Sequence, residues 1–227
     1  MERNDLTQGS VGKNLIRFAL PYLLACFMQT FYGMADLFVV GLYNGSETTT
    51  AVSIGSQVMH MLTVIIVGLV MGATVRIGRY VGAKDERGAG KTVGCAVVLF
   101  SAFAAVLTVI LLLGVNIITN VMLTPQEAVS ETRLYLLICF AGIPFITAYN
   151  VVSGIFRGAG DSRRPMYFVA VACVVNIALD FVLIGGYGLG AAGAALGTVL
   201  GQAVSVVFSL VMMRGRDFGF QVTRQDI

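Results

Sequence analysis

The chain has 227 residues, of which 57% are hydrophobic and 12% are charged, and its formal net charge is +3. Soluble domains carry about 25% charged residues, so this composition excludes an ordinary soluble domain and is typical of a chain surrounded mostly by lipid. The small net charge, with no basic patch interleaved with aromatic residues, argues against nucleic-acid binding.

Six stretches meet the requirement of about 20 mostly apolar residues for a helix that crosses a membrane. We therefore expect an all-α membrane protein with spans at residues 15–42, 51–75, 92–113, 132–156, 166–184 and 191–213. The spans form one transmembrane region, 15–213. A short segment, 1–14, precedes it, and the tail 214–227 is either a stub or the start of a connection.

The basic residues predict the direction of these spans. Of the 15 Lys and Arg residues, all but Arg133 lie before or at the start of the first span, in the connections after the second and fourth, or after the sixth. The connections at residues 43–50 and 185–190 contain none. Because cytoplasmic loops carry an excess of Lys and Arg, both termini are predicted to be cytoplasmic.

Two acidic residues, Asp36 and Asp180, fall within the expected spans. A carboxylate in the hydrocarbon region is costly, so each should face a protein or water-filled interior and have partners. At about 1.5 Å per residue, both lie in the outer half of the membrane at similar depth, and they could share one cavity. The alternative is that each carboxylate only fastens neighbouring helices together.

Helical spacing adds polar neighbours to each carboxylate. Gln29 and Tyr32 lie seven and four residues before Asp36, and Asn176 lies four residues before Asp180, so each set shares a helix face. These faces predict a polar interior rather than isolated polar residues.

Thr198 on the sixth span lies at a matching depth. Two carboxylates, an amide and a hydroxyl in a low-dielectric space could bind Na⁺ through oxygen ligands or hold protons. Two close carboxylates cannot both ionise without a large energetic cost unless a cation lies between them. The pattern therefore indicates a site for Na⁺ or H⁺.

Pro21 removes a backbone donor from the first span and is expected to kink it, either as a hinge or as a tolerated membrane-helix proline. His60, near Gln57 in the second span, could relay protons or be a neutral, hydrogen-bonded residue. With one His and no CxxC pair, neither a transition-metal site nor a nucleophilic triad is expected, and the chain is not predicted to be an enzyme.

Five segments in order resemble the N-terminal half of the multidrug and toxic compound extrusion (MATE) transporters, of the prokaryotic DinF-like type. They read FALPYLLACFMQTFYGMADLFVVG, AVSIGSQVM, RIGRYVGAKDERGAGKTVG, FRGAGDSRRPMY and NIALDFVLIGGYGLGAAGAALGT. The resemblance covers essentially the whole chain.

The resemblance implies one six-helix lobe of a two-lobed antiporter in the plasma membrane of a prokaryote. Such transporters export small organic, often cationic, compounds in exchange for Na⁺ or H⁺ and use no other cofactor. Matching positions imply a cation-binding network and a bending proline. The network comprises Asp36, Asn176, Asp180, Thr198, Tyr135 and Asn150, and the proline is Pro21. The residue pattern itself, apart from the resemblance, gives Gln29, Tyr32, Gln57 and His60 as cavity-lining candidates.

The second lobe of the family is absent from this sequence, and three explanations stay open. The chain is a truncated fragment, a half-transporter that works as a homodimer, or a half that needs a separate chain. Two rival functions also stay open: a flippase for lipid-linked precursors, and a non-transporting membrane fragment. The basic residues lie in loops rather than in a central cavity, which disfavours anionic flippase substrates.

Overall fold

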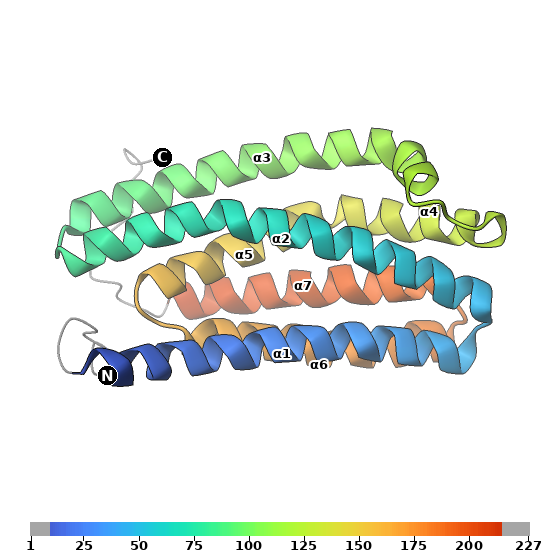
Figure 1. Ribbon diagram of the computed structural model, residues 1–227, viewed down its shortest axis with the longest axis horizontal. Helices are drawn as coiled ribbons and strands as arrows, with labels where there is room; N and C mark the ends of the chain where they lie inside the picture. The colour runs from blue at the N-terminus through green and yellow to red at the C-terminus, as the bar shows by residue number, and fades with distance from the viewer. Residues whose placement is uncertain (1–9, 215–227) are drawn as a thin grey trace.

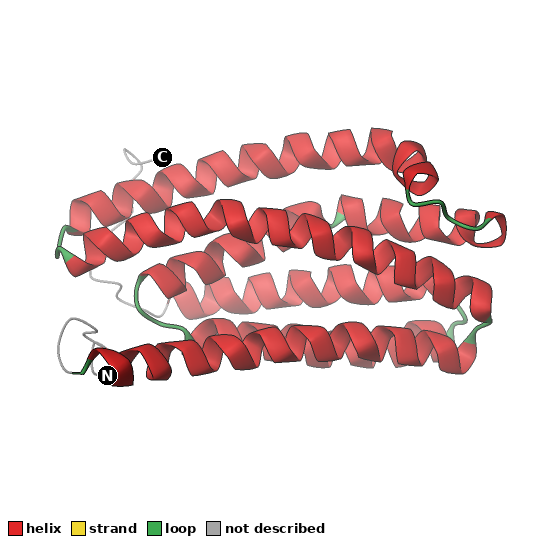
Figure 2. Cartoon of the chain, in the orientation of Figure 1, coloured by secondary structure: helices red, strands yellow, loops and turns green. Residues whose placement is uncertain are grey.

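The computed structural model describes residues 10–214, and nearly all of them lie in long helices (Figures 1 and 2). The elements in chain order are α1 (Val11–Tyr43), α2 (Ser46–Gly82), α3 (Glu86–Val121), α4 (Gln126–Ala141), α5 (Ile143–Gly158), α6 (Arg163–Asp180), the π-helix η1 (Phe181–Gly186) and α7 (Gly190–Arg214). Parts of the predicted terminal segments, 1–9 and 215–227, lie outside the described residues.

The predicted all-α membrane fold is confirmed. Within the described residues, five helical segments are long and apolar enough to cross a membrane, namely α1, α2, α3, α6 continued by η1, and α7. The bent pair α4 and α5 forms the sixth span if it is counted as one. The helices extend beyond the predicted spans, because an apolar run marks only the part of a helix that lies in the hydrocarbon region.

The fourth span is broken, which the prediction of a continuous helix over 132–156 got wrong. α4 ends at Ala141, α5 begins at Ile143, and the two are bent by 49°. Pro144 lies in the first turn of α5, where it needs no backbone donor, whereas inside a continuous helix its missing N–H would leave a carbonyl unpaired. A β-carbon on Gly142 would lie 2.5 Å from Cγ2 of Val199, so α7 packs directly against the break.

α4 also begins six residues earlier than the predicted span, and this brings Glu131 into the helix. Asp36 and Asp180 are therefore not the only acidic residues in spanning helices. Oε2 of Glu131 is buried and has no hydrogen-bond partner among the described residues. The sequence pattern missed it because Glu131 borders on the apolar run.

α1 continues through Pro21 without interruption (Figure 1). Pro21 is buried, so its ring packs inside the bundle rather than facing lipid. The expected kink is not accompanied by a break in the helix, and the role of Pro21 as a hinge stays a prediction.

The helices pack into a bundle whose outside is apolar. α6 packs most extensively against α7 and α1, and α2 packs against α4 and α5. Large apolar side chains remain exposed along the spans, for example Phe27, Phe38 and Ile117, which are 68%, 64% and 68% exposed. Soluble proteins rarely expose apolar surface on this scale, whereas lipid covers it without cost.

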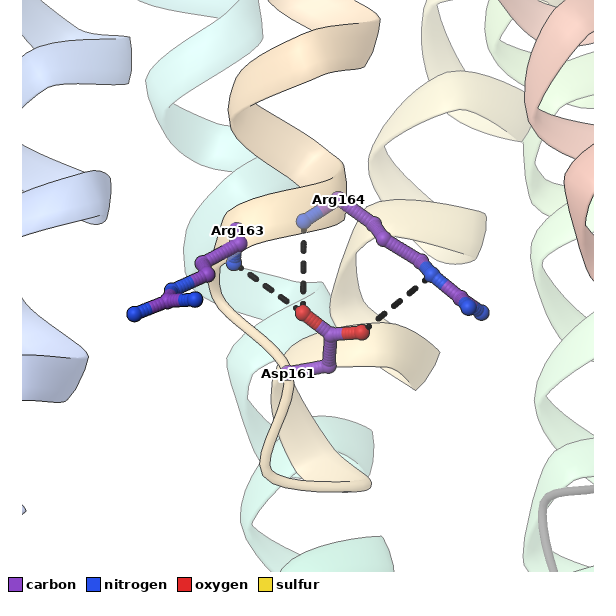
Figure 3. Close-up of polar contacts among 3 residues, drawn as sticks. All are labelled: Asp161, Arg163 and Arg164. Atoms are coloured by element: carbon purple, nitrogen blue, oxygen red, sulfur yellow. Dashed lines mark hydrogen bonds and ion pairs between the residues drawn. The ribbon is translucent and has the colours of Figure 1, made fainter. Parts of the chain in front are cut away.

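The turns α2–α3 and α5–α6 lie at the same end of the bundle as the start of α1 and the end of α7 (the left end of Figure 1). These are the segments that carry most of the basic residues. In the α5–α6 turn, Oδ1 of Asp161 accepts hydrogen bonds from the backbone N–H groups of Arg163 and Arg164 at 3.1 and 3.2 Å (Figure 3). Oδ2 lies 3.5 Å from Nε of Arg164, so Asp161 holds the start of α6 in place. We call the end of the bundle that carries the α2–α3 and α5–α6 turns the basic end.

Candidate functional site

Asp36 and Asp180 meet inside the bundle, near the end opposite the basic end. Asp36 comes from α1 and is 3% exposed, and Asp180 is the last residue of α6 and is fully buried. The two carboxyl groups lie within hydrogen-bonding range of each other. Neither forms an ion pair with a described residue.

Thr198 of α7 completes a contact among three helices. Its hydroxyl Oγ1 donates a hydrogen bond to Oδ2 of Asp36 at 3.3 Å. Oδ1 of Asp36 and both carboxyl oxygens of Asp180 are buried without a hydrogen-bond donor in the part of the chain that the structure describes. A proton on either carboxyl group would supply the missing donor, because one carboxyl would then donate to the other.

Asn176 lies one turn before Asp180 and beside Asp36. Its amide nitrogen and oxygen are buried, and neither makes a well-aligned hydrogen bond within residues 10–214. Buried polar atoms are nearly always paired, so five such atoms from three neighbouring residues call for a proton, a cation or water between them.

Close helix contact builds this site. A β-carbon on Gly197 would collide with Oδ1 of Asp180 and lie 3.4 Å from Nδ2 of Asn176. A β-carbon on Gly201 would lie 3.0 Å from the carbonyl oxygen of Ala172. The small residues thus let α7 approach α6 at the level of the carboxyl pair.

The helix changes its form directly after Asp180. The π-helix η1 runs from Phe181 to Gly186, so the wider turn begins at the residue after the carboxylate. π-turns within α-helices are rare and occur often at functional sites, because they rotate the side chains that follow.

Tyr135 and Asn150 take different positions. Tyr135 is buried, close enough to Asp36 for electrostatic interaction, and its hydroxyl lies 3.1 Å from Oγ of Ser56. Asn150 is also buried, but its Nδ2 donates to the carbonyl oxygen of Ile146 in its own helix at 2.8 Å. The described contacts bring Tyr135, and not Asn150, into the group around Asp36.

The four cavity-lining candidates divide into two pairs. Tyr32 lies beside Asp36 and beside the amide of Gln202, and Gln29 is half-buried on the same helix. Gln57 and His60 of α2 are exposed on the surface of the lobe. An exposed position is what residues lining a cavity between this lobe and another would have, and their role stays a prediction.

The sequence patterns missed three residues near the site. Gln202 on α7 and Tyr149 on α5 lie near Tyr32, and Cys139 on α4 lies near both Asp36 and Tyr32. Gln202 follows Thr198 by four residues, and this shared face was the signal that could have identified it.

The arrangement offers oxygen ligands from Asp36, Asp180, Asn176 and Thr198, and it offers two carboxyl groups that can share a proton. Within the described residues, no group of three or more His, Cys, Asp and Glu residues could hold a metal ion. A monovalent cation or a proton fits this mixed set of oxygens, since one positive charge relieves the repulsion between two buried carboxylates.

Fold and site together define a multi-pass helical membrane protein with a buried carboxyl pair. Residues 21–182 match the family profile MatE, and the chain belongs to this family.

Two similar proteins are named as probable multidrug resistance proteins. The probable multidrug resistance protein YpnP of Bacillus subtilis is 28% identical over 210 residues, which cover 92% of this chain and 47% of YpnP. The probable multidrug resistance protein NorM of Thermotoga maritima is 28% identical over 218 residues, which cover 92% of this chain and 46% of NorM. The chain thus spans about half the length of the relatives it matches.

Solved structures of transporters match the fold of this chain. A MATE crystal structure in the bent conformation matches all of this chain and 51% of its own, with a TM-score of 0.91 and 28% identity. A MOP superfamily transporter from Pyrococcus furiosus, described as having a binding pocket of reverse polarity, matches all of this chain and 50% of its own, with a TM-score of 0.91 and 29% identity. The chain has the fold of one lobe of such a transporter.

Proposed function

We propose that this chain is the ion-binding lobe of a secondary antiporter that exports small organic, often cationic, compounds in exchange for Na⁺ or H⁺. The proposal rests on one observation: Asp36 and Asp180 lie buried side by side, and three of their four carboxyl oxygens have no donor among residues 10–214. The names of YpnP and NorM as probable multidrug resistance proteins support export as the direction of transport.

The mechanism follows from charge. Two ionised carboxylates in a low-dielectric interior repel each other, and a proton or Na⁺ between them removes that repulsion. The pair draws α1 and α6 together through these side chains, and Thr198 adds α7. Occupancy by the ion therefore favours one arrangement of the three helices, and release favours another, which couples the ion to the conformation of the lobe.

Transport needs a surface that completes the substrate cavity. We propose that a second lobe supplies it, either from another copy of this chain or from a separate chain, in the plasma membrane of a prokaryote. The exposed polar residues Gln57 and His60 would then line the cavity between the lobes. The proposed activity is transport and not catalysis.

A flippase for anionic lipid-linked precursors is the second candidate. The similarity to a transporter described as having a pocket of reverse polarity keeps it open, because the lobe fold alone does not fix the charge of the substrate. Competition of dye export by organic cations, and not by anionic lipids, would favour the multidrug assignment. The reverse pattern would favour the flippase.

The test uses everted membrane vesicles that contain the chain and an imposed Na⁺ or pH gradient. We expect Asp36→Asn and Asp180→Asn each to abolish gradient-driven dye export, because a neutral amide neither takes up a proton nor supplies the negative charge that attracts Na⁺. Glu47→Gln is the matched control, since Glu47 is exposed in the first turn of α2. Export that survives in both Asp variants would sink the coupling role.

A further inference from the structure

Polar side chains continue from the carboxyl pair toward the basic end, inside the bundle. They come from α1, α5 and α7, and we call them the inner seam: Tyr32, Gln202, Tyr149, Ser153, Tyr22 and Arg157. On α5 they recur every four residues, which places Tyr149, Ser153 and Arg157 on one helix face.

The upper part of the seam touches the site. Tyr32 lies one turn from Asp36 on α1 and within electrostatic range of it, and its hydroxyl lies alongside the side chain of Gln202. Gln202 is 8% exposed, and its Oε1 is buried without a donor in the described range. Tyr32 of α1 is also within electrostatic range of Tyr149 of α5, the next member of the seam.

The lower part leads from Tyr149 to the basic end. Tyr149 is 4% exposed, lies beside Ser153, and is within electrostatic range of both Tyr22 and Arg157. The guanidinium of Arg157 lies over the ring of Tyr22, with its Cζ 5.6 Å from the ring centre. Its Nε is buried and has no acceptor within residues 10–214.

The chemistry of the seam suits protons rather than Na⁺. Below Asp36 the seam offers hydroxyl and amide groups but no carboxylate, whereas a Na⁺ ion would need several oxygen ligands at each position to replace its water shell. A hydroxyl can accept a proton on its oxygen while giving up its own, so the positive charge advances and each group returns to neutral. The guanidinium at the lower end repels cations, as arginine does in water channels.

We propose that the inner seam carries protons between the carboxyl pair and the basic end of the lobe, and that Arg157 is the cation barrier at its lower end. This inference rests on the proposed function, and it adds a route and a gate to the ion site. The other titratable groups that face Asp36 are Asp180, Tyr135, Cys139 and Cys173, and none of them belongs to the seam.

The experiment measures proton leak into liposomes that contain the full chain and a trapped pH dye, with a potassium-diffusion potential as the driving force. We expect the wild-type chain to be tight. Arg157→Gln should raise the proton leak about tenfold or more, because a tenfold faster rate needs only a modest lowering of the free-energy barrier to proton movement past this position. Arg157→Lys keeps the positive charge and should stay tight.

Arg164→Gln is the matched control. Arg164 also lies at the basic end, but over the ring of Phe156 rather than in the seam, so its loss should leave the leak at the wild-type level. Adding Tyr149→Phe or Asp36→Asn to Arg157→Gln should return the leak to that level, since each removes a step of the route.

Two results overturn the proposal: an Arg157→Gln chain as tight as wild type, or a leak that persists with Asp36→Asn. The outcomes are separable from those of the export test. If Asp36→Asn abolishes export while Arg157→Gln does not leak, the ion site stands and the route fails. If export survives the loss of both carboxylates, the proposed function fails whatever the leak shows.

Discussion

Gly197 is the residue that allows α7 to lie against the carboxyl pair. Gly197→Ala would place a β-carbon onto Oδ1 of Asp180, so the carboxyl group or the helix must move. We expect a loss of about 1–3 kcal/mol in stability, as for other overpacked positions, together with a weaker effect of Na⁺ or pH on the melting temperature. Thermal melting of the purified chain, with and without Na⁺ and at several pH values, measures both.

Gly72→Ala is the control for this variant. A β-carbon on Gly72 of α2 would meet nothing within 4 Å, and helix propensity favours Ala over Gly. Its melting temperature should equal or exceed that of the wild type. A Gly197→Ala chain that melts like the wild type and keeps the full ion effect would show that the close approach of α7 is unimportant.

Sequence reasoning found the two carboxylates because an acidic residue in an apolar span is rare and needs an explanation. Asn176 and Thr198 followed from helical spacing and depth. Sequence reasoning did not identify Gln202 and Tyr149, because amide and phenol side chains are common in membrane helices. Only the rotation of each helix in the structure shows which of these side chains face inward.

At the scale of the elements, the apolar runs predicted all six spans but not their irregularities. Pro21 and Pro144 both lie within apolar runs, yet α1 continues through the first and the fourth span breaks at the second. The difference lies in the neighbours. Gly142 stands two residues before Pro144 and packs against Val199, which a one-dimensional pattern does not reveal.

Pro21→Ala tests whether α1 bends in the working cycle. α1 is unbroken at Pro21, and alanine would restore a backbone donor, so the variant should melt at the same temperature as the wild type or higher. If the proline serves as a hinge, ion-driven export should fall although the fold is intact. A lower melting temperature would contradict this expectation, because it would mean that the buried ring contributes more than the missing donor costs.

At the scale of the whole molecule, the described residues form one lobe and leave the polar residues Gln57 and His60 exposed. A cavity for the exported compound needs a second surface opposite them. If a homodimer supplies it, the dimer fraction of the purified chain, separated by size and reconstituted into proteoliposomes, should carry the export activity. A stable monomer with full export activity would rule out the need for a second copy.

The central claim is that Asp36 and Asp180 share one cation, and infrared spectroscopy of the purified chain tests it most directly. We expect the stretching band of a protonated, buried carboxyl group, which weakens when the pH rises or when Na⁺ is added, and which is absent from the Asp36→Asn/Asp180→Asn double variant. A band that is missing from the wild type, or that is unchanged in the double variant, would contradict the account.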